Sequence, residues 1–324
     1  MGVVILGTGS SLPEKIVTNS DLEKIVDTSD EWITTRTGIR QRRISGPGEQ
    51  AYILASRAAE KALKVADVKA EDLDAIIIAS ISSHLTMPSC ACMVQQEIGA
   101  SKAFAYDVNA ACSGFLYALN AGYQYVQNNS QMKVLCIGAE TLSARTNWQD
   151  RNTCVLFADG AGAAVIGFEE GGRGILGSKL YSDGSLWKLL YLSAAESLNE
   201  DLRVPELEGS FIRMEGREVF KHAVKAMHEA VTTLLEETGT SIDSIKILIP
   251  HQANIRILNK LADKLGLEEE QVFINVGSYG NTSAASVPVA LDEAVREGRI
   301  EKGDLVMFCS FGGGFTWASC LIKW

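Results

Sequence analysis

The chain lacks the features that mark membrane-embedded, secreted or nucleic-acid-binding proteins. Its longest uninterrupted apolar runs, such as AIIIA at 75–79, are far too short to span a bilayer. The N-terminal stretch MGVVILGTGSSLP lacks the basic segment with which a signal peptide begins. The formal net charge of −10 leaves no broad basic face to displace counterions from nucleic acid. We therefore expect no membrane and no nucleic-acid partner.

Paired cysteines are also missing. The seven cysteines contain no C-x-x-C pair and are odd in number, which predicts reduced, mostly buried thiols in a cytoplasmic protein. Cys90 and Cys92 are close together, but one C-x-C pair without further ligands is a poor zinc signal, and no metal is predicted. With only four histidines in the chain, the search for a histidine partner to a nucleophile is short.

What the chain does contain is a weak internal repeat. An amphipathic pattern at 55–68 leads into a buried strand at 70–80, and the same order recurs at 223–239 and 241–254. Each copy continues with a helix, a strand, a turn of small residues and a second helix. The offset is about half the chain, as expected of a duplicated unit.

The repeat predicts an α/β protein whose sheets are covered on both sides. Two similar halves, 1–170 and 171–324, would meet around a pseudo-twofold axis, with functional residues where they meet. The segment around 171–212 breaks the pattern, so it is expected to cross between the halves and add loops over one face.

Cys112 lies in the stretch DVNAACSGFLYAL at 107–119, between small residues and an apolar run that suits a buried helix. A thiol at a helix N-terminus faces unpaired N–H groups and the positive end of the helix dipole, which lowers its pKa from about 8.5. A free cysteine is more often a small buried hydrophobe. Taken alone, the stretch leaves both interpretations open.

Two further residues suit a nucleophilic cysteine. His251 directly follows an apolar strand and a proline, and chain ends of buried strands are where α/β proteins place sites. Asn281, in SYGNTSAAS, occupies the turn of the second repeat opposite Cys112, although an asparagine can also simply satisfy a tight turn. Together the three residue types fit thiolate chemistry with donors for a developing oxyanion.

These stretches resemble the β-ketoacyl-acyl-carrier-protein synthases III, initiating condensing enzymes of the thiolase superfamily. The resemblance covers essentially the whole chain, through DEWITTRTGIRQRRI (30–44), AACSGFLYAL (110–119), FADGAGAAVIG (157–167), HQANIRI (251–257), GNTSAASVPVALDEAVREGRI (280–300) and FGGGFTW (311–317). It implies a thiolase-like fold of layered αβαβα type and a homodimer. DGAGAA at 159–164 is expected to serve tight packing rather than phosphate binding.

The resemblance implies a ping-pong reaction without a cofactor. Cys112 takes the acyl group of an acyl-CoA, and malonyl-acyl-carrier protein then loses carbon dioxide and attacks the acyl-cysteine. His251 and Asn281 would stabilise the enolate, and the backbone N–H groups of Cys112 and Gly314 the tetrahedral intermediate. The product is a 3-oxoacyl-acyl-carrier protein, which initiates type II fatty acid synthesis.

The resemblance also assigns binding residues. Trp32 and Arg151 would sandwich the CoA adenine, Arg36 would contact the CoA phosphates, and Asn254 the pantetheine arm. A basic rim for the acidic carrier protein is expected at Lys221, Arg256 and Lys264.

Two departures from the family pattern leave the primer open. Met87 stands where the family places a gate at the end of the acyl pocket, contributed across the dimer interface. Phenylalanine there is associated with short primers, whereas methionine repacks readily and leaves the primer length open. Acetyl-CoA is kept as the default primer. The stretch 194–212 is longer than usual and would alter the pocket lid.

Three alternatives remain at this stage. A related enzyme of secondary metabolism would use the same three residues with another primer or acceptor. A thiol hydrolase of the papain kind shares the residue types but lacks its usual sequence surroundings here. An acyl-CoA-binding protein would leave Cys112 unmodified.

Overall fold

The structure, a computed structural model, describes residues 2–194, 201, 203–204 and 209–324. Its strands are β1 (Gly2–Ser11), β2 (Ile16–Thr18), β3 (Gln41–Arg43), β4 (Ala75–Ala79), β5 (Phe104–Val108), β6 (Val134–Thr141), β7 (Asp159–Glu169), β8 (Gly174–Ser182), β9 (Leu190–Leu192), β10 (Ile212–Met214), β11 (Ile245–Pro250), β12 (Leu305–Gly312) and β13 (Thr316–Lys323). Its α-helices are α1 (Asn19–Leu22), α2 (Asp30–Thr37), α3 (Ala51–Ala66), α4 (Cys90–Glu97), α5 (Gly114–Asn128), α6 (Gly216–Thr238), α7 (Ile255–Leu265), α8 (Val276–Tyr279) and α9 (Ser286–Arg296).

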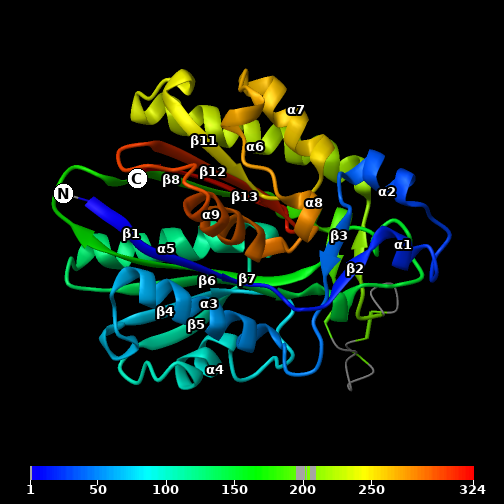
Figure 1. Ribbon diagram of the computed structural model, residues 1–324, viewed down its shortest axis with the longest axis horizontal. Helices are drawn as coiled ribbons and strands as arrows, with labels where there is room; N and C mark the ends of the chain where they lie inside the picture. Colours follow the sequence, from blue (N-terminus) through cyan, green and yellow to red (C-terminus); the bar gives the residue numbers. More distant parts are fainter. Residues whose placement is uncertain (1, 195–200, 202, 205–208) are drawn as a thin grey trace.

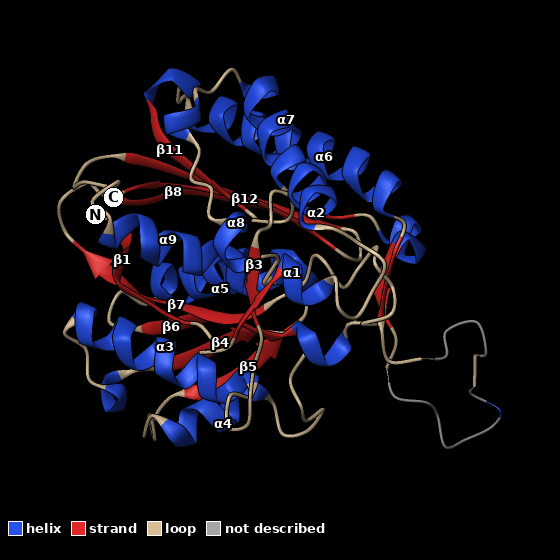
Figure 2. Cartoon of the chain, turned by 45° about the vertical axis from the view of Figure 1, so that its right-hand side comes forward, coloured by secondary structure: helices blue, strands red, loops and turns tan. Residues whose placement is uncertain are grey.

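Two mixed β-sheets form the centre of the molecule. The strand order is β1-β7-β6-β4-β5 in the larger sheet and β11-β12-β13-β8 in the smaller one. Helices α5 and α9 lie between the sheets, α3 and α4 cover the outer face of the larger sheet, and α6 and α7 cover the smaller one (Figures 1 and 2). The predicted αβαβα layering is therefore confirmed.

The strands of the two sheets come from different parts of the chain. The larger sheet draws on residues 2–169 and the smaller on residues 174–323. The segment after 171 differs from the prediction, because it begins with β8, which pairs antiparallel with β13 at the sheet edge. Strands β9 and β10 then pair with each other. Most of the long stretch 194–212 falls outside the described residues.

The second repeat has one strand fewer than predicted. The apolar stretch FINV at 273–276 is the strand predicted for this copy, but only an isolated bridge between Leu248 and Val272, just before the stretch, forms. The Gln252 side chain explains the difference, because its amide group donates to the Phe273 carbonyl and its oxygen accepts from the Asn275 N–H at 2.9 Å. A side chain thus takes hydrogen bonds that a continuing strand would use, and the chain turns into α8.

Small residues let the two halves approach closely. A Cβ atom on Gly138 of β6 would lie 2.1 Å from the Ala284 carbonyl oxygen, just before α9. A Cβ on Gly162 of β7 would lie 2.6 Å from the Val289 nitrogen in α9 itself. The DGAGAA stretch therefore serves close helix–sheet packing, as predicted. The core between the sheets joins side chains of both halves, such as Ile77 and Phe308.

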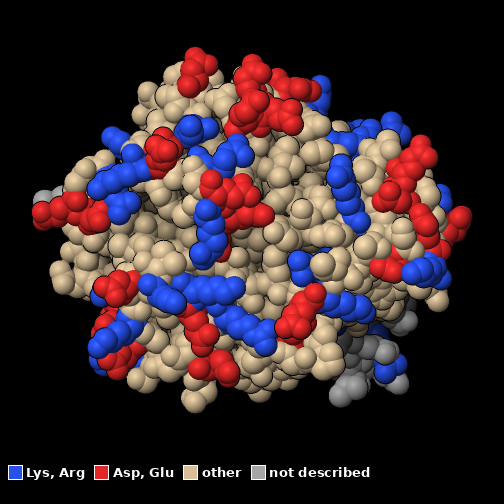
Figure 3. All heavy atoms as spheres, in the orientation of Figure 1, with Lys and Arg blue, Asp and Glu red and all other residues tan. Residues whose placement is uncertain are grey.

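The surface carries charges of both signs. On the face seen in Figure 3, Lys and Arg side chains are interspersed with Asp and Glu. Among the described residues, no helix combines the length and the apolar character that crossing a membrane requires. Five of the seven cysteines are buried and all seven are free thiols, as the sequence predicts.

Candidate active site

Cys112 lies in a single 3₁₀ turn (Ala111–Ser113) that leads directly into α5. The turn begins with Ala111 in a left-handed conformation, at φ 45°. Gly312, at the end of β12, packs against it so closely that a Cβ there would lie 2.5 Å from the Cys112 nitrogen. The half-buried thiol thus stands at the N-terminal end of a helix that runs between the two sheets.

The second half repeats this turn. Ser283 is left-handed at φ 50°, and the 3₁₀ turn Ser283–Ala285 leads into α9. Positions 111 and 283 are 172 residues apart, so Ala284 occupies the position equivalent to Cys112. By the same offset Asn281 corresponds to Asn109, and each asparagine side chain accepts the N–H group two residues further on. Asn281 therefore lies in the predicted turn, but its direct counterpart is Asn109.

His251 is buried at the carboxyl end of β11. Its backbone N–H donates to the Cys309 carbonyl at 2.8 Å, and its Nδ1 atom lies 2.6 Å from the Ser286 hydroxyl. Burial lowers the pKa of the imidazole to about 3, so the ring is neutral at physiological pH. With Nδ1 engaged, Nε2 is the ring nitrogen that remains for a substrate.

The backbone of Asn281 is fixed by hydrogen bonds of both its N–H and its carbonyl group. Its N–H donates to the Leu156 carbonyl and its carbonyl accepts the Ala158 N–H, both at 2.9 Å. Its Oδ1 atom accepts the Ser283 N–H at 2.9 Å. Because the side-chain oxygen is occupied in this way, the amide Nδ2 is the group free to donate to a bound oxyanion.

One cavity of about 1380 Å³ brings these groups together. Cys112, His251 and Asn281 all line it, and so does Gly314 from the loop after β12. One cavity therefore contains the four residues that were predicted to take part in the reaction, and these residues come from four separate stretches of the chain.

Sequence reasoning missed a carboxylate beside these residues. Glu140, near the end of β6, is completely buried, and its Oε1 atom accepts the Ser283 hydroxyl at 3.1 Å. Its Oε2 atom accepts the Ile81 N–H at 3.2 Å and the Ser82 hydroxyl. Burial raises the pKa of Glu140 to about 7. The only sequence signal was an acidic residue at the end of the otherwise apolar strand KVLCIGAE (133–140).

The thiol of Cys112 is not activated in the resting structure. Burial raises its pKa to about 12, the Glu140 charge adds to that rise, and a hydrogen bond with Ser283 opposes it. The predicted lowering of this pKa is therefore wrong for the resting enzyme, because burial and a nearby negative charge outweigh the helix terminus.

The three residues predicted to bind the CoA nucleotide lie together. The guanidinium carbons of Arg36 and Arg151 lie 4.7 and 5.2 Å from the Trp32 ring centroid. Arg151 also donates to the Asp27 carbonyl at 3.1 Å. A flat base stacked between Trp32 and Arg151 would require a separation of about 7 Å between the two side chains, which is twice a normal contact distance. In this structure Arg151 occupies the space where the adenine is expected.

The other predicted binding residues divide into two groups. Asn254, Arg256 and Lys221 line the cavity, whereas Lys264 lies on the exposed last turn of α7, away from it. Asn254 also caps α7, since its Oδ1 atom accepts the Arg256 N–H at 2.9 Å. Arg217, one turn before Lys221 on α6, lines the cavity as well and was not predicted.

Met87 does not line this cavity in a single chain. Its side chain is 85% exposed, while the neighbouring Leu85 and Thr86 do line the cavity. The single chain therefore presents Met87 outward, beside the mouth of the site.

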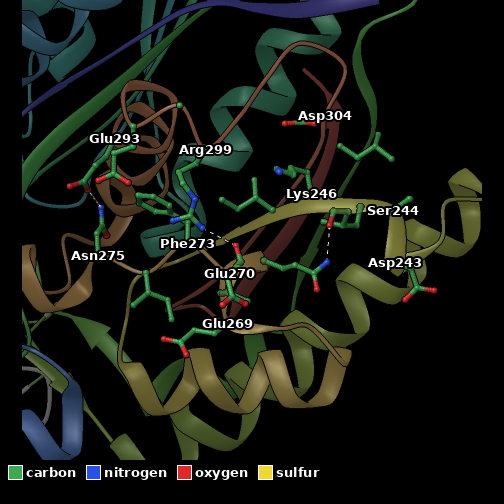
Figure 4. Close-up of a pocket in the computed structure, with 18 of the residues that line it drawn as sticks. Asp243, Ser244, Lys246, Glu269, Glu270, Phe273, Asn275, Glu293, Arg299 and Asp304 are labelled. Carbon is green, nitrogen blue, oxygen red and sulfur yellow. Dashed lines mark hydrogen bonds between the residues drawn. The ribbon is translucent and has the colours of Figure 1, made fainter.

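A second groove, of about 1120 Å³, lies along the β11 edge of the smaller sheet (Figure 4). Acidic side chains such as Glu269, Glu293 and Asp304 surround it, and Arg299 donates to the Glu270 carbonyl at 2.8 Å. It contains none of the predicted site residues. Within the described part of the chain, no cluster of His, Cys, Asp and Glu is arranged to hold a metal ion.

Comparison with known proteins extends these findings. Residues 106–184 match the family of 3-oxoacyl-[acyl-carrier-protein (ACP)] synthase III, and residues 235–324 match its C-terminal part. A β-ketoacyl-[acyl-carrier-protein] synthase III of Desulfotalea psychrophila is 71% identical over 324 residues, 100% of both chains. The crystal structure of 3-oxoacyl-[acyl-carrier-protein] synthase III from Aquifex aeolicus matches with a TM-score of 0.93 and 46% identity, covering 100% of both chains.

A second solved structure is similar over almost as much of the chain. The priming β-ketosynthase from the R1128 polyketide biosynthetic pathway has a TM-score of 0.93 and 33% identity, covering 99% of this chain and 96% of that one. The layered fold with a cysteine-centred cavity at the meeting point of its halves defines a thiolase-type acyltransferase. Within that class, the chain belongs to the 3-oxoacyl-[acyl-carrier-protein] synthase III family, the condensing enzymes that initiate fatty acid synthesis.

Proposed function

We propose that this enzyme condenses a short acyl-CoA, by default acetyl-CoA, with malonyl-acyl-carrier protein in a ping-pong reaction through an acyl-Cys112 intermediate. The observation that carries the proposal is the shared cavity of Cys112, His251 and Asn281. The product is a 3-oxoacyl-acyl-carrier protein. The reaction uses no cofactor beyond the CoA thioester itself, and the reduced thiols fit the cytoplasm.

In the first half-reaction, the Cys112 thiolate attacks the thioester carbonyl. The developing oxyanion is stabilised by the backbone N–H groups of Cys112 and Gly314, and the CoA thiolate leaves. The position of Cys112 at the start of α5 supports this step, because the helix N-terminus favours negative charge on the sulfur and on the nearby oxygen.

In the second half-reaction, malonyl-acyl-carrier protein loses carbon dioxide. The Nε2–H group of neutral His251 and the Nδ2 amide of Asn281 donate to the enolate oxygen, and the enolate carbon attacks the acyl-cysteine. The lowered pKa of His251 supports this role, because a neutral ring can donate without first shedding a charge. Fixed donors of this kind need no reorganisation when the charge develops.

Binding of acyl-CoA then requires a rearrangement at the cavity mouth. We propose that the adenine displaces Arg151 from the Trp32 ring and is stacked between the two, while Arg36 contacts the CoA phosphates. Asn254 contacts the pantetheine arm with its free amide nitrogen. Cation–π contacts already hold both arginines over the indole, so the residues of the clamp are gathered before the ligand arrives, and Arg151 moves aside to admit the base.

The remaining proposals concern partners. Arg217, Lys221 and Arg256 at the cavity form the rim for the acidic carrier protein, and Lys264 extends it along α7. The chain forms a homodimer in which Met87 closes the acyl pocket of the partner subunit. The outward position of Met87 and the exposed Phe104 on the edge strand β5 support this arrangement. The halves 1–170 and 171–324 are proposed to be the two structural units of each subunit.

Mass spectrometry of the intact protein tests the central proposal. Incubation with acetyl-CoA is expected to add an acetyl group to Cys112, and malonyl-acyl-carrier protein is expected to remove it as acetoacetyl-acyl-carrier protein. A Cys112→Ala variant is the control for the site of modification. An unmodified Cys112 in the wild type would contradict covalent catalysis and favour a protein that only binds acyl-CoA. Hydrolysis without carbon–carbon bond formation would favour a thiol hydrolase.

A second candidate is a priming enzyme of secondary metabolism with a different primer or acceptor. The similarity to the R1128 priming ketosynthase favours it, as does methionine at position 87. Primers from acetyl to branched and medium-chain CoA, offered with malonyl-acyl-carrier protein or malonyl-CoA, distinguish the two. The leading proposal fails if no short primer yields a ketoacyl-acyl-carrier protein.

A further inference from the structure

The buried Glu140 carboxyl group has no assigned role, yet it lies one hydroxyl away from the nucleophile. Its Oε1 atom accepts the Ser283 hydroxyl at 3.1 Å, and the Ser283 side chain is hydrogen-bonded to Cys112. Ser283 stands in a left-handed conformation at φ 50°, which L residues rarely adopt. The turn thereby holds this hydroxyl between a thiol and a carboxylate from the other half of the molecule.

All partners of Glu140 are neutral donors. They are the hydroxyls of Ser80, Ser82 and Ser283 and the N–H groups of Ile81 and Ala284, and none of the ion pairs found in the described residues includes Glu140. A fully buried carboxylate without a cation is costly to keep charged, so it readily accepts a proton. The titratable groups that feel its charge are the thiols of Cys112 and of Cys90 on α4.

A single hydroxyl group therefore links the sulfur to the carboxylate. The Ser283 O–H donates to Oε1 of Glu140, and the hydrogen bond between the Ser283 side chain and Cys112 favours the thiolate. The alternative base, His251, is much weaker, since burial lowers its pKa to about 3. Glu140 does not itself line the cavity, but it lies directly behind Ser283, which does, and is therefore placed to take the proton.

We propose that Glu140 accepts the proton of Cys112 through the Ser283 hydroxyl during acylation and returns it when the product leaves. This inference rests on the proposed acyl-Cys112 intermediate. As the thiol proton moves to Ser283, the Ser283 proton moves to Glu140, leaving a thiolate and a neutral carboxylic acid. The thiolate forms the new carbon–sulfur bond, and the CoA thiolate leaves with its electron pair and takes a proton from solvent.

Condensation closes the cycle with protons and charge in balance. Decarboxylation releases carbon dioxide and leaves an enolate, whose carbon bonds to the acyl carbon. The resulting oxyanion collapses and expels the Cys112 thiolate. Glu140 then returns its proton through Ser283, so the enzyme regains a thiol and a carboxylate. Glu140 acts through Ser283 throughout and contacts no substrate atom.

Single-turnover acylation by acetyl-CoA, followed by quenching and mass spectrometry between about pH 5.5 and 9, tests the proposal. In the wild type, the acylation rate should rise through the pKa of Glu140, at about 7, and then level off. Glu140→Gln keeps an acceptor for Ser283 but cannot take a proton. It should lower the plateau by about 10²-fold, the lower end of general-base contributions, and abolish that inflection.

Two further variants locate the path. Ser283→Ala should lose as much rate as Glu140→Gln, and the double variant should lose no more, because both changes interrupt one path. Asp292→Asn is the matched control, since Asp292 is a buried carboxylate that accepts the hydroxyls of Thr8 and Ser10 and does not line the cavity. It should leave acylation unchanged. Thermal unfolding confirms that each variant is folded, and Ser283→Ala remains informative if Glu140→Gln is not.

Alkylation by iodoacetamide separates proton transfer from simple electrostatics. Removing the Glu140 charge should lower the thiol pKa and speed alkylation at neutral pH, while acylation becomes slower. If Glu140→Gln instead speeds both reactions, Glu140 acts only through its charge, and the proposal is overturned. It is also overturned if the variant keeps the inflection near pH 7. A wild type that is never acylated contradicts the proposed function instead.

Discussion

The Nδ1 atom of His251 lies 2.6 Å from the hydroxyl of Ser286, the first residue of α9. The same hydroxyl oxygen accepts the Gln252 N–H at 3.3 Å. The Ser286 O–H can donate to Nδ1 when the ring proton is on Nε2. That tautomer is the one that the proposed enolate requires, because Nε2 then acts as the donor.

Ser286→Ala is therefore expected to slow decarboxylation and spare acylation. The imidazole remains but is no longer held in one tautomer, so the loss should be about 10- to 10²-fold, less than the about 10²–10³-fold of a deleted oxyanion donor. Release of carbon dioxide from malonyl-acyl-carrier protein and acetylation of Cys112 are measured separately. Ser319→Ala, which removes a buried hydroxyl donating to the Ala230 carbonyl, is the control. Equal losses in both half-reactions would contradict the assignment.

His251→Ala and Asn281→Ala should show the same division more strongly. Each removes one enolate donor while leaving Cys112 and its turn intact. We expect each to lower the decarboxylation rate by about 10²–10³-fold and to retain some acylation, whereas Cys112→Ala abolishes condensation. Parallel loss of both half-reactions in the histidine and asparagine variants would mean that these residues also serve acylation.

Gly312→Ala should slow acylation by displacing Cys112, although the thiol itself is unchanged. A Cβ at this position would lie 2.5 Å from the Cys112 nitrogen, so the 3₁₀ turn must move. We expect acylation to fall at least about 10-fold, because small displacements of reacting groups are costly. The control is Gly184→Ala, where an added Cβ meets nothing within 4 Å. Unchanged acylation in Gly312→Ala would show that the turn tolerates displacement.

The pKa of His251 predicts how stability depends on pH. The folded chain keeps this imidazole neutral down to about pH 3, whereas the unfolded chain protonates it near its ordinary value of 6.5. The unfolded state thus binds more protons between these values, and stability falls as pH drops through this window. His251→Gln lacks this contribution. Urea unfolding near pH 6.5 and 4.5 should show a smaller acid loss in the variant, and an equal loss would contradict a buried neutral ring.

Trp32→Ala is expected to affect only substrates that carry a nucleotide. Its ring forms one wall of the proposed adenine clamp. The variant should raise the KM for acetyl-CoA about 10-fold, as loss of a stacking contact of about 1–3 kcal/mol implies. Acetyl-pantetheine, which lacks the adenine, provides the internal control because its reaction should be unchanged. Equal effects on both substrates would mean that Trp32 supports the fold rather than binding the adenine.

The large-scale organisation of this chain could be predicted because it follows from patterns that repeat along the sequence. The apolar periodicity marks α3 and β4, and later α6 and β11, with the same spacing. The FINV stretch misled the prediction because its apolar residues suit a strand. The side chain of Gln252, more than twenty residues away, takes the hydrogen bonds instead.

The partners of the site residues were harder to predict for a related reason. Ser283 and Ser286 lie in a motif quoted above and Glu140 ends an apolar strand, but the roles of all three depend on contacts between distant segments. Glu140 and Ser283 are separated by 143 positions and meet only because the two halves pack face to face. The raised pKa of Cys112 is likewise a property of burial, which the local sequence of a helix start does not reveal.

The repeated turn at 111–113 and 283–285 has a consequence for stoichiometry. Two equivalent turns could have supplied two nucleophiles, but Ala284 stands where the second sulfur would be. The duplicated architecture is thus specialised, because one copy of the turn carries the thiol and the other carries Ser283 beside it. In the proposed reaction each chain is loaded only once, and the proposed dimer would carry two acyl groups, because half of a chain holds no complete site.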